Sequence, residues 1–405
     1  MRVIRGYIFA FVFVFMIAEG LFAQHTMTSS PYSMFGLGEM ASGLYGQNVS
    51  MAGVSIGMRD GKLINGENPA GLTAMDTCSL LAEASAFIKS ERYHSRGDGT
   101  DAFTGNFSAF SLGGRLMRRW YAAVGLIPYS FVGYYFRTTE DLEGAPGSYV
   151  SSAFEGSGGL SKAYLSQGFA LTRYLSVGVN LNYIFGNMTQ GESQSSMAMA
   201  RKISGSAFHA DFGVQYHRPI GRETYLTLGA VYGYKQRITL RSEVAVAGSD
   251  AEATYEKRTE RQYLPPYLGV GAVLTRKKWT YALDYRFRQY SVINSDESRA
   301  TFRDAHESRL GVCFAPGGFG SDSYWKRMAY KMGVSVAMPY YLRWKGGSGF
   351  AYRVSAGLDL PLLEGRLNAA FFYDYLRLSS DAMERSLLGF TLAFTLSERL
   401  YRVKL

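Results

Sequence analysis

From about residue 78 onward, apolar and polar residues alternate along the chain with a period of two. In 174–186, one set of alternate positions carries Leu, Val, Tyr and Phe, and the other carries mainly Ser, Gly and Asn. The same alternation recurs in 208–217, 279–288, 352–360 and 390–397. Successive side chains of a β-strand point to opposite faces, so the pattern predicts strands with one apolar and one polar face.

The pattern predicts about fourteen strands, most of them ten or more residues long, as a tilted transmembrane strand requires. They span 78–93, 103–116, 119–136, 159–172, 174–188, 203–217, 223–246, 253–275, 279–290, 300–315, 327–341, 350–362, 366–378 and 385–402. The pair 223–246 and 253–275 is longer than a bilayer requires, so we expect it to project as a twisted hairpin.

The predicted connections alternate between two kinds. Short turns fall at 116–119, 172–173, 218–222, 275–278 and 363–365, and longer polar loops fall at 94–101, 138–158, 189–202, 291–299 and 379–384. Short turns on one side and long loops on the other are typical of outer-membrane barrels, although the turn at 315–325 is long for the short side. The predicted fold is therefore all-β, a transmembrane antiparallel β-barrel of about 14 strands.

The composition excludes several other classes of protein. Aromatic residues make up 15% of the 405 residues and charged residues only 19%, against roughly 25% in an average soluble chain. The hydrophobic fraction of 47% excludes disorder, and two cysteines exclude a disulfide scaffold. A mean hydropathy of −0.08 is too low for a bundle of membrane helices but suits strands that alternate lipid-facing and lumen-facing residues.

The chain divides into three predicted parts. Residues 1–23 resemble a secretory signal, with Arg2 and Arg5 before an apolar run of about a dozen residues. Cleavage after Ala23 is the first choice and cleavage after Gly20 the alternative; a short buried core helix is the competing interpretation. Residues 24–77 lack strand alternation and could fold into the lumen as a hatch, and 78–405 form the barrel. This organisation predicts the outer membrane of a Gram-negative bacterium.

A net charge of +10 would be compatible with a nucleic-acid partner. The Lys and Arg residues are dispersed, with no run of five or more, so we expect no nucleic-acid binding. On an outer-membrane barrel, basic rims would instead meet membrane lipid and the phosphates of lipopolysaccharide.

A family resemblance rests on Asn68-Pro69-Ala70 just before the first strand, on the strand count and on the predicted plug. The Gly-rich strand entry 156–160, the opening 30–38 and the closing strand 392–405 add to it. In these features the chain resembles the FadL family of outer-membrane transporters for long-chain fatty acids and other hydrophobic compounds. The resemblance implies uptake of a fatty-acid-like molecule. Two alternatives stay open: a binding or assembly component in a secretion or cell-surface complex with other envelope proteins, and a passive polar pore.

The resemblance also implies a route for the ligand. A hydrophobic molecule would enter an apolar lumen pocket, the hatch with Phe35 would shift, and the molecule would leave sideways at a kinked third strand. Pro128 lies in the third predicted strand and could make such a gap or an ordinary bulge. A ligand carboxylate could meet an inward Arg286, Arg288 or Arg353, and inward Asp284, Asp359 and Asp374 are expected to join lumen ion pairs that hold the hatch.

No catalytic or metal-binding constellation emerges from the sequence. The five histidines are scattered, and His94 beside Ser95 and Asp98 is best explained as part of a solvated loop. We therefore expect no enzymatic activity, no cofactor and no metal. Cys78 and Cys313 could form a disulfide in an oxidising compartment or remain free thiols, and free thiols are favoured.

Overall fold

The computed structural model describes residues 30–41, 45–95, 98–141, 149–194, 197–248, 251–293, 300–317, 323–379 and 384–399. The predicted signal segment 1–23 lies outside these residues, so its role stays a prediction.

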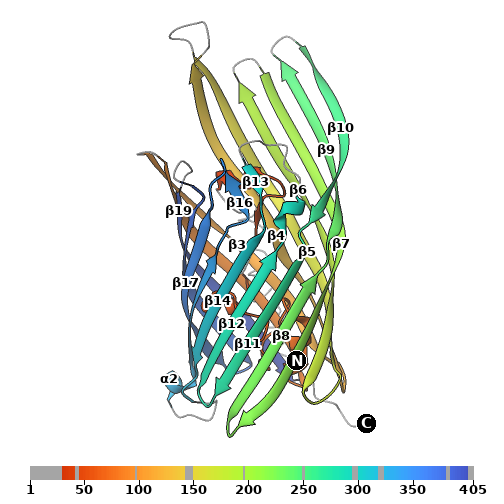
Figure 1. Cartoon of the computed structure of the whole chain (residues 1–405), viewed down its shortest axis with the longest axis vertical. Coiled ribbons are helices and arrows are strands. Elements are labelled where there is room, and N and C mark those ends of the chain that lie inside the picture. The colour runs from red at the N-terminus through yellow and green to blue at the C-terminus, as the bar shows by residue number, and fades with distance from the viewer. Residues whose placement is uncertain are drawn as a thin grey trace, which may run out of the picture.

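Fourteen antiparallel wall strands form a closed barrel (Figure 1). They are β2 (Ser79–Ser95), β3 (Asp98–Met117), β4 (Trp120–Asp141), β5 (Tyr149–Ala170), β6 (Leu175–Gln194), β7 (Met197–Gly221), β8 (Thr224–Gly233) continued by β9 (Gln236–Gly248), β10 (Ala251–Leu264) continued by β11 (Tyr267–Arg276), β12 (Trp279–Arg288), β14 (Ala305–Phe314), β15 (Ala329–Ala337), β17 (Phe350–Leu362), β18 (Gly365–Arg377) and β19 (Glu384–Arg399). Pairing of β19 with β2 closes the wall. The predicted fold class and strand number are confirmed.

The remaining elements are short and lie inside the barrel or at its ends. They are η1 (Pro31–Met34), β1 (Glu39–Met40), η2 (Gln47–Met51), η3 (Pro69–Ala74), η4 (Tyr290–Val292), β13 (Ala300–Phe302), α2 (Tyr324–Arg327) and β16 (Leu342–Trp344). β13 and β16 pair with each other. Within the described ranges, no helix has the length and apolar character needed to cross a bilayer.

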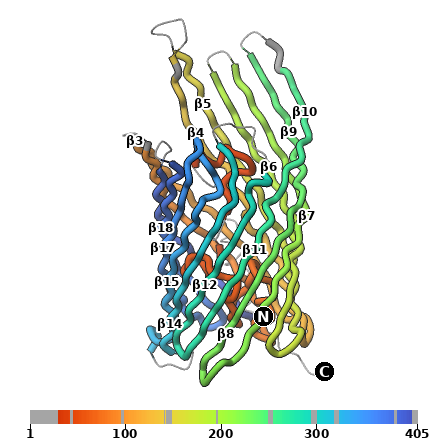
Figure 2. Tube along the Cα trace, in the orientation of Figure 1, coloured from red at the N-terminus to blue at the C-terminus, as the bar shows by residue number. Residues whose placement is uncertain are grey.

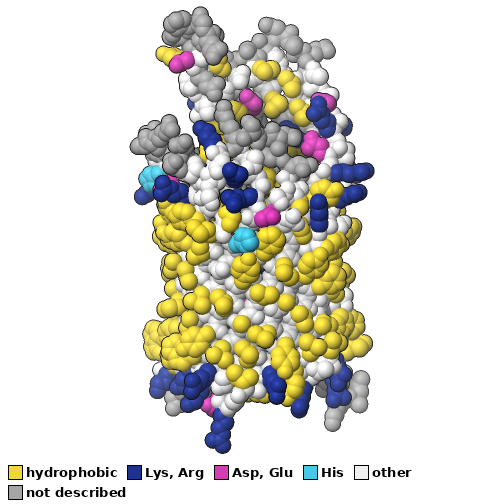
Figure 3. All heavy atoms as spheres, in the orientation of Figure 1, with side chains coloured by type: hydrophobic (Ala, Val, Ile, Leu, Met, Phe, Trp, Pro, Cys, Tyr) yellow, Lys and Arg dark blue, Asp and Glu magenta, His cyan; other side chains and the backbone are white. Residues whose placement is uncertain are grey.

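A band of hydrophobic side chains runs across the visible face of the barrel, with Lys and Arg gathered above and below it (Figure 3). β7 illustrates how the alternation produces this band. Phe208 is 73% exposed on the outside, whereas Asp211 is 2% exposed on the inside. On β6, Leu181 is likewise exposed and Asn182 is buried. The predicted outward and inward faces of these strands are therefore confirmed.

One side of the barrel is much taller than the other. The hairpins β4–β5, β6–β7 and β9–β10 rise well above the remaining strands (Figures 1 and 2). The projection predicted for 223–246 and 253–275 is confirmed by β9 and β10. We call this end of the barrel the rim end and the opposite end, where the short connections lie, the turn end.

Three predicted loops were placed wrongly. Most of 138–158 and 189–202, and part of 94–101, belong to strands. The ladders continue to Asp141↔Tyr149, Gln194↔Met197 and Ser95↔Asp98. Cross-strand backbone hydrogen bonds hold these polar segments extended beyond the hydrophobic band, where no apolar face is required.

The N-terminal segment occupies the barrel interior, where Figure 2 shows its red trace. It packs against inward-facing glycines of eight wall strands, which we call the glycine belt: Gly168, Gly178, Gly213, Gly229, Gly271, Gly311, Gly333 and Gly357. Several of these pair directly across strands, as Gly178 does with Gly213 and Gly311 with Gly333. A Cβ at Gly213 would overlap the Asn68 side chain, and one at Gly333 would overlap the Met51 backbone. The belt therefore makes the room that this segment, the hatch, requires.

Candidate functional site

The barrel wall is interrupted between β3 and β4. Their ladder ends at Phe110↔Leu126, although both strands continue well beyond this pair. Pro128 follows at once, and the ladder of β4 with β5 shifts register between Pro128 and Ser130. Proline has no backbone N–H to donate and is typical of bulges and edges, which explains why the break falls here. The structure thus places Pro128 beside a break in the wall.

The hatch supplies hydrogen bonds to the edge of β4 that β3 leaves. Its strand β1 pairs antiparallel with β4 in the register Glu39↔Phe131 and Met40↔Ser130. The N–H of Ala41 donates to the carbonyl of Tyr129 at 3.0 Å, and the N–H of Gly133 donates to Ser33 Oγ at 3.0 Å. Buried backbone groups that lose a ladder partner are costly unless they find another. The hatch therefore takes the place of β3 along this stretch.

Two cavities lie on either side of β1. The first, which we call the arginine cavity, encloses about 970 Å³ of empty space including its open mouth and is lined by Glu39 from β1. The second, which we call the β4 cavity, encloses about 680 Å³ counted in the same way and is lined by Ala41, Pro128 and Tyr129. Met40, Arg288 and Tyr290 line both. The hatch strand on the β4 edge thus also separates the two cavities.

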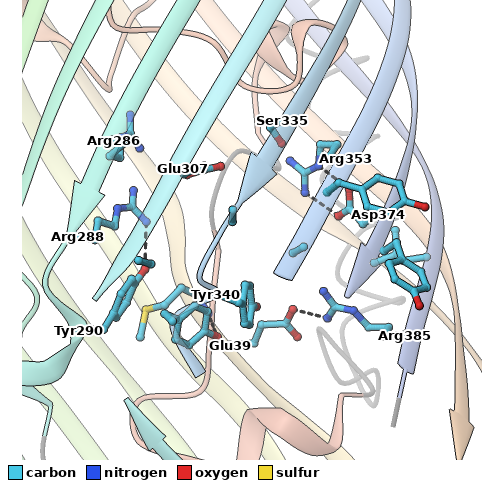
Figure 4. A pocket seen from close by; sticks show the side chains of 18 of the residues that line it. Glu39, Arg286, Arg288, Tyr290, Glu307, Ser335, Tyr340, Arg353, Asp374 and Arg385 are labelled. Atoms are coloured by element: carbon cyan, nitrogen blue, oxygen red, sulfur yellow. Dashed lines mark hydrogen bonds and ion pairs between the residues drawn. The ribbon is translucent and has the colours of Figure 1, made fainter. Parts of the chain in front are cut away.

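Most cations of the arginine cavity have carboxylate partners (Figure 4). Arg353 is bidentate to Asp374, at 2.6 and 2.7 Å. Arg385 pairs with Glu39, and Lys89 lies 3.2 Å from Glu91. These pairs join β17 to β18, β19 to the hatch, and two inward positions of β2. They neutralise one another, so these cations are already balanced before a ligand arrives.

Arg288 differs from these cations. It donates a 3.3 Å hydrogen bond to the Tyr290 hydroxyl and lies over the Tyr267 ring, 5.7 Å from its centroid. Among the described residues it has no carboxylate within ion-pair distance. In Figure 4 its side chain lies beside Tyr290, with the hydrogen bond between them drawn as a dashed line. Its guanidinium is therefore available to an anionic group, at the point where the two cavities meet.

Tyrosines give the arginine cavity its apolar surface. Tyr290, Tyr340, Tyr341, Tyr352 and Tyr375 line it. The Tyr341 ring centroid lies 4.6 Å from that of Tyr290 and 4.5 Å from that of Tyr340. Aromatic rings beside one uncompensated guanidinium suit a molecule with an apolar body and an anionic end.

The β4 cavity is more polar than a pocket for an unfunctionalised hydrocarbon would be. His209 lies 3.0 Å from Asp211, which also accepts a 2.7 Å hydrogen bond from Asn182 Nδ2. Lys162 faces the same space. Ile127, Ile184 and Leu264 supply the apolar part of its lining. Such a mixed lining matches a molecule that carries both apolar and polar groups.

The predicted motif Asn68-Pro69-Ala70 anchors the hatch to the wall and lines neither cavity. Asn68 is fully buried, and its Nδ2 donates to the carbonyl of Ile56 at 2.7 Å and to that of Val214 at 3.3 Å. Its Oδ1 accepts from the N–H of Ala70 at 3.1 Å, so the side chain caps η3, which Pro69 begins. The motif thus joins two parts of the hatch to β7.

Phe35 also lies away from the two cavities. It is 7% exposed, and its ring centroid is 5.9 Å from that of Trp344 on β16. It belongs to an apolar cluster that contains Ile293 and Leu342. Its contacts fix the start of the hatch to segments at the mouth of the barrel.

Charged groups of the hatch are paired with inward-facing arginines of the wall. Burial alone would raise the pKa of the Asp60 carboxyl, but Arg366 at 3.0 Å and the N–H of Lys62 lower it to about 2. Burial likewise opposes ionisation of Glu67, yet Arg286 at 2.8 Å brings the pKa of Glu67 well below its ordinary value. Both carboxylates are therefore charged at neutral pH and hold the hatch to the wall.

The Arg286–Glu67 pair yields a testable prediction. Arg286→Gln leaves Glu67 without its cation, and because Arg286 is only 3% exposed we expect hatch opening to become easier by about 3 kcal/mol. Hydrogen exchange of hatch amides measures this opening separately from barrel unfolding. The double variant Arg286→Gln/Glu67→Gln should recover most of the loss. Additive effects of the two single changes would show that the pair is not coupled.

Several site residues were not predicted from the sequence. Glu39 and Met40 lie in a two-residue strand, too short to give a periodic signal. Lys89 and Glu91 did have a readable signal, because opposite charges two residues apart share one face of a strand. Both are almost fully buried in the lumen. Opposite charges at inward positions of a predicted barrel strand therefore indicate a buried ion pair.

The described residues contain no group of three or more His, Cys, Asp or Glu that could hold a metal ion. Cys78 is exposed and Cys313 half-buried, and both are free thiols. The expectation of no catalytic activity stays a prediction.

Fold and site together define the chain as a transmembrane β-barrel whose lumen is closed by an N-terminal hatch. The sequence model of the BamG family matches residues 3–399, and the chain belongs to this family. No curated protein matches the chain.

Solved structures of hydrophobic-compound transporters share this fold. The toluene transporter TodX of Pseudomonas putida has a TM-score of 0.61 at 14% identity, covering 89% of this chain and 100% of that one. The toluene transporter TbuX of Ralstonia pickettii has a TM-score of 0.61 at 13% identity, with 89% and 99% covered. A FadL homologue of Pseudomonas aeruginosa has a TM-score of 0.61 at 11% identity, with 91% and 100% covered. The predicted FadL-like fold is confirmed, and the matching family model is that of BamG.

Proposed function

We propose that the protein takes up a fatty-acid-like amphiphile across the outer membrane and releases it sideways through the break between β3 and β4. One observation carries the proposal: hatch strand β1 occupies the free edge of β4 and at the same time separates the arginine cavity from the β4 cavity. If β1 leaves this edge, the two cavities join and the wall at Pro128 loses its inner cover. The likeness in fold to hydrophobic-compound transporters supports this function.

The proposed route has three steps. The molecule enters the arginine cavity from the rim end and places its apolar body against Tyr340 and Tyr341. Its anionic group then meets Arg288, where the two cavities adjoin. Displacement of β1 lets it pass into the β4 cavity and leave beside Pro128. A sideways exit keeps an apolar body out of a water-filled lumen and delivers it directly to lipid.

The proposed orientation follows from the two ends of the barrel. Short turns of outer-membrane barrels face the periplasm and long hairpins face the exterior, so the rim end is the outer end. Lipopolysaccharide would then surround the bases of the tall hairpins. This orientation makes the arginine cavity reachable from outside the cell.

A binding and uptake experiment tests the function. We expect cells that lack their own fatty-acid transporter to take up labelled oleate when they produce this protein. Arg288→Gln should weaken oleate binding about tenfold, because a hydrogen bond between charged groups contributes roughly 1.5–3 kcal/mol. Arg258→Gln, an exposed arginine on β10, is the matched control and should bind as the wild type does. Wild-type protein that neither binds nor imports oleate would contradict the proposal.

The tall hairpins favour a second candidate function, as a component of a complex with other envelope proteins. Among the described ladders, β10 pairs with β9 alone. Tyr255 on β10 is 75% exposed and Met197 on β7 is 50% exposed, far from the hydrophobic band. Native mass spectrometry after gentle extraction would show a partner in fixed stoichiometry if this function holds. Isolation of the chain free of protein partners would leave uptake as the function.

A further inference from the structure

Exposed cations form an arc at the turn end of the barrel. The β3–β4 turn carries Arg118 and Arg119, and the β5–β6 turn carries Arg173. Arg218 lies near the end of β7, the β7–β8 turn carries Arg222, and the β11–β12 turn carries Lys277 and Lys278. We call these seven residues the basic collar. All are exposed, and the four turns contain a single acidic residue, Glu223. Figure 3 shows Lys and Arg side chains directly below the hydrophobic band at this end.

Neighbouring turns of the arc are tied together by backbone hydrogen bonds. The N–H of Ala170 on β5 donates to the carbonyl of Arg119 at 2.9 Å. The N–H of Lys277 donates to the carbonyl of Glu223, also at 2.9 Å, and so links the β7–β8 and β11–β12 turns. These bonds hold the backbones of neighbouring turns side by side along the perimeter of the barrel.

Aromatic side chains lie next to the collar on the strands that enter these turns. Trp120 stacks on Phe169 with ring centroids 6.0 Å apart, and Trp279 packs against Phe314 at 4.4 Å. Tyr174 lies beneath the Arg173 guanidinium, 4.5 Å from ring centroid to charge. Aromatic girdles of membrane barrels lie at the interface between the hydrocarbon core and the headgroups. The collar, one step further out, therefore lies at the depth of the lipid phosphates.

The charge balance at the rim end is different. There Arg92 pairs with Asp101 at 2.7 Å and Arg258 with Glu256 at 2.7 Å. Lys257 likewise pairs with Glu243 at 3.1 Å. Within the described parts of the chain, no collar cation lies within ion-pair distance of a carboxylate. The rim end thus neutralises many of its own cations, whereas the turn end leaves its cations for an anion from outside the chain.

We propose that the basic collar is a binding site for anionic phospholipids, whose headgroup phosphates it holds at the turn end of the barrel. A thin arc that follows the perimeter and borders an aromatic girdle matches a row of lipid headgroups better than a compact protein surface. Each Lys or Arg near an anionic membrane surface adds to the electrostatic attraction, and guanidinium groups bind phosphate with two parallel hydrogen bonds. The lipid concerned carries a net negative charge, as phosphatidylglycerol does. Zwitterionic phosphatidylethanolamine, whose amine balances its phosphate, is bound more weakly.

Competition between two lipids tests this site. The purified full chain is offered equal amounts of phosphatidylglycerol and phosphatidylethanolamine with the same acyl chains, and the lipids that stay bound are counted by native mass spectrometry. We expect the wild type to retain phosphatidylglycerol about fivefold or more in excess, and less so in high salt. Arg118→Gln/Arg119→Gln/Arg173→Gln, which removes three of the seven collar cations, should lower the ratio at least twofold.

The control removes the same number of exposed cations at the rim end, as Lys257→Gln/Arg258→Gln/Arg261→Gln, and should keep the wild-type ratio. Heat-modifiable migration in gels verifies that both variants are folded barrels. Equal retention of the two lipids by the wild type would overturn the proposal. So would a preference that stays undiminished in the collar variant, or one that falls only in the rim-end control, which would move the lipid site to the other end. Loss of a co-purifying acidic protein from the collar variant, with the lipid ratio unchanged, would assign the collar to a protein partner instead.

Discussion

Joining β1 to β4 by a disulfide is expected to reduce oleate uptake to the level of cells without the protein. The pair Met40→Cys and Ser130→Cys is suited to this crosslink. Met40 and Ser130 are register partners. The N–H of Ala41 donates to the carbonyl of Tyr129, so Ala41 and Tyr129 form a hydrogen-bonded pair and the neighbouring pair Met40 and Ser130 is a non-hydrogen-bonded one. Non-hydrogen-bonded pairs bring Cα atoms to about 4.5 Å, within the range that a disulfide spans. The crosslink should therefore form without distortion of either strand.

The physical reason for the expected loss is the double role of β1. The same residues cover the free edge of β4 and divide the two cavities, so a β1 that cannot leave keeps both the internal passage and the wall closed. Reduction of the disulfide should restore uptake in the same sample. Oleate binding to Arg288 should persist in the oxidised protein, because the crosslink leaves the opening of the arginine cavity unobstructed. A lock that stops transport but leaves binding intact is the signature of a gate.

The variant requires replacement of the native thiols by Cys78→Ser and Cys313→Ser. A matched control places a disulfide elsewhere in the lumen wall: Thr280→Cys faces the native Cys313 as its register partner on β14, with Cys78→Ser as background. Oxidation of this control should leave uptake unchanged, since it joins two strands that are already paired. Equal uptake by oxidised and reduced Met40→Cys/Ser130→Cys protein would exclude β1 as the gate.

The barrel itself could be predicted because lipid imposes a strict rule on the sequence. Leu181 faces the hydrophobic band and Asn182 faces the lumen, and many strands repeat this alternation inside the band. Beyond the band the rule no longer applies. The upper parts of β5 and β7 are held extended by their cross-strand hydrogen bonds, and their polar, irregular sequences predict loops instead. Strand ends outside the membrane depend on the neighbouring strand, which a local pattern does not contain.

The inward-facing residues of the site could be predicted from the sequence, but the contacts between them could not. Strand parity placed Arg286, Arg288 and Arg353 in the lumen, where all three lie. Strand parity does not predict which of them form ion pairs. Arg286 pairs with Glu67 and Arg353 with Asp374, while Arg288 has no carboxylate partner among the described residues. These pairings join segments far apart in the sequence and depend on strand register. The glycine belt has the same character, because the inward glycines are visible in the sequence but their alignment appears only when the strands are paired.

Gly213→Leu is expected to convert the closed barrel into a water-filled pore. Gly213 lies directly under Asn68 and Pro69, so even a Cβ there would overlap the Asn68 side chain. A leucine must either displace η3 or bend β7, and β7 is held on both edges by long ladders with β6, β8 and β9. Overpacking of this kind typically costs about 1–3 kcal/mol, and the hatch is the part that can yield. We therefore expect η3 to leave its place while the wall stays intact.

A fourteen-stranded lumen without its hatch is wide enough to conduct water and small solutes. Conductance in planar bilayers, together with swelling of liposomes in sugar solutions, should rise from near the lipid background to that of an open pore. Gly333→Leu should do the same from the opposite side of the belt, where Met51 lies. Val214→Leu changes the lipid-facing neighbour on the same strand and should leave the barrel closed.

The same variants separate closure by the hatch from transport through the gate. In this scheme the hatch as a whole closes the lumen and β1 alone opens the side exit. Gly213→Leu should then pass sugars. The oxidised Met40→Cys/Ser130→Cys protein, whose glycine belt is unchanged, should pass neither sugars nor oleate. A folded Gly213→Leu barrel with wild-type conductance would mean that segments other than the hatch close the lumen. A wild-type barrel that already conducts sugars would make the passive pore the better description. Gly213→Ala, which adds only the Cβ, should give a conductance between those of the wild type and Gly213→Leu, because the Asn68 side chain can move slightly but the rigid Pro69 ring cannot.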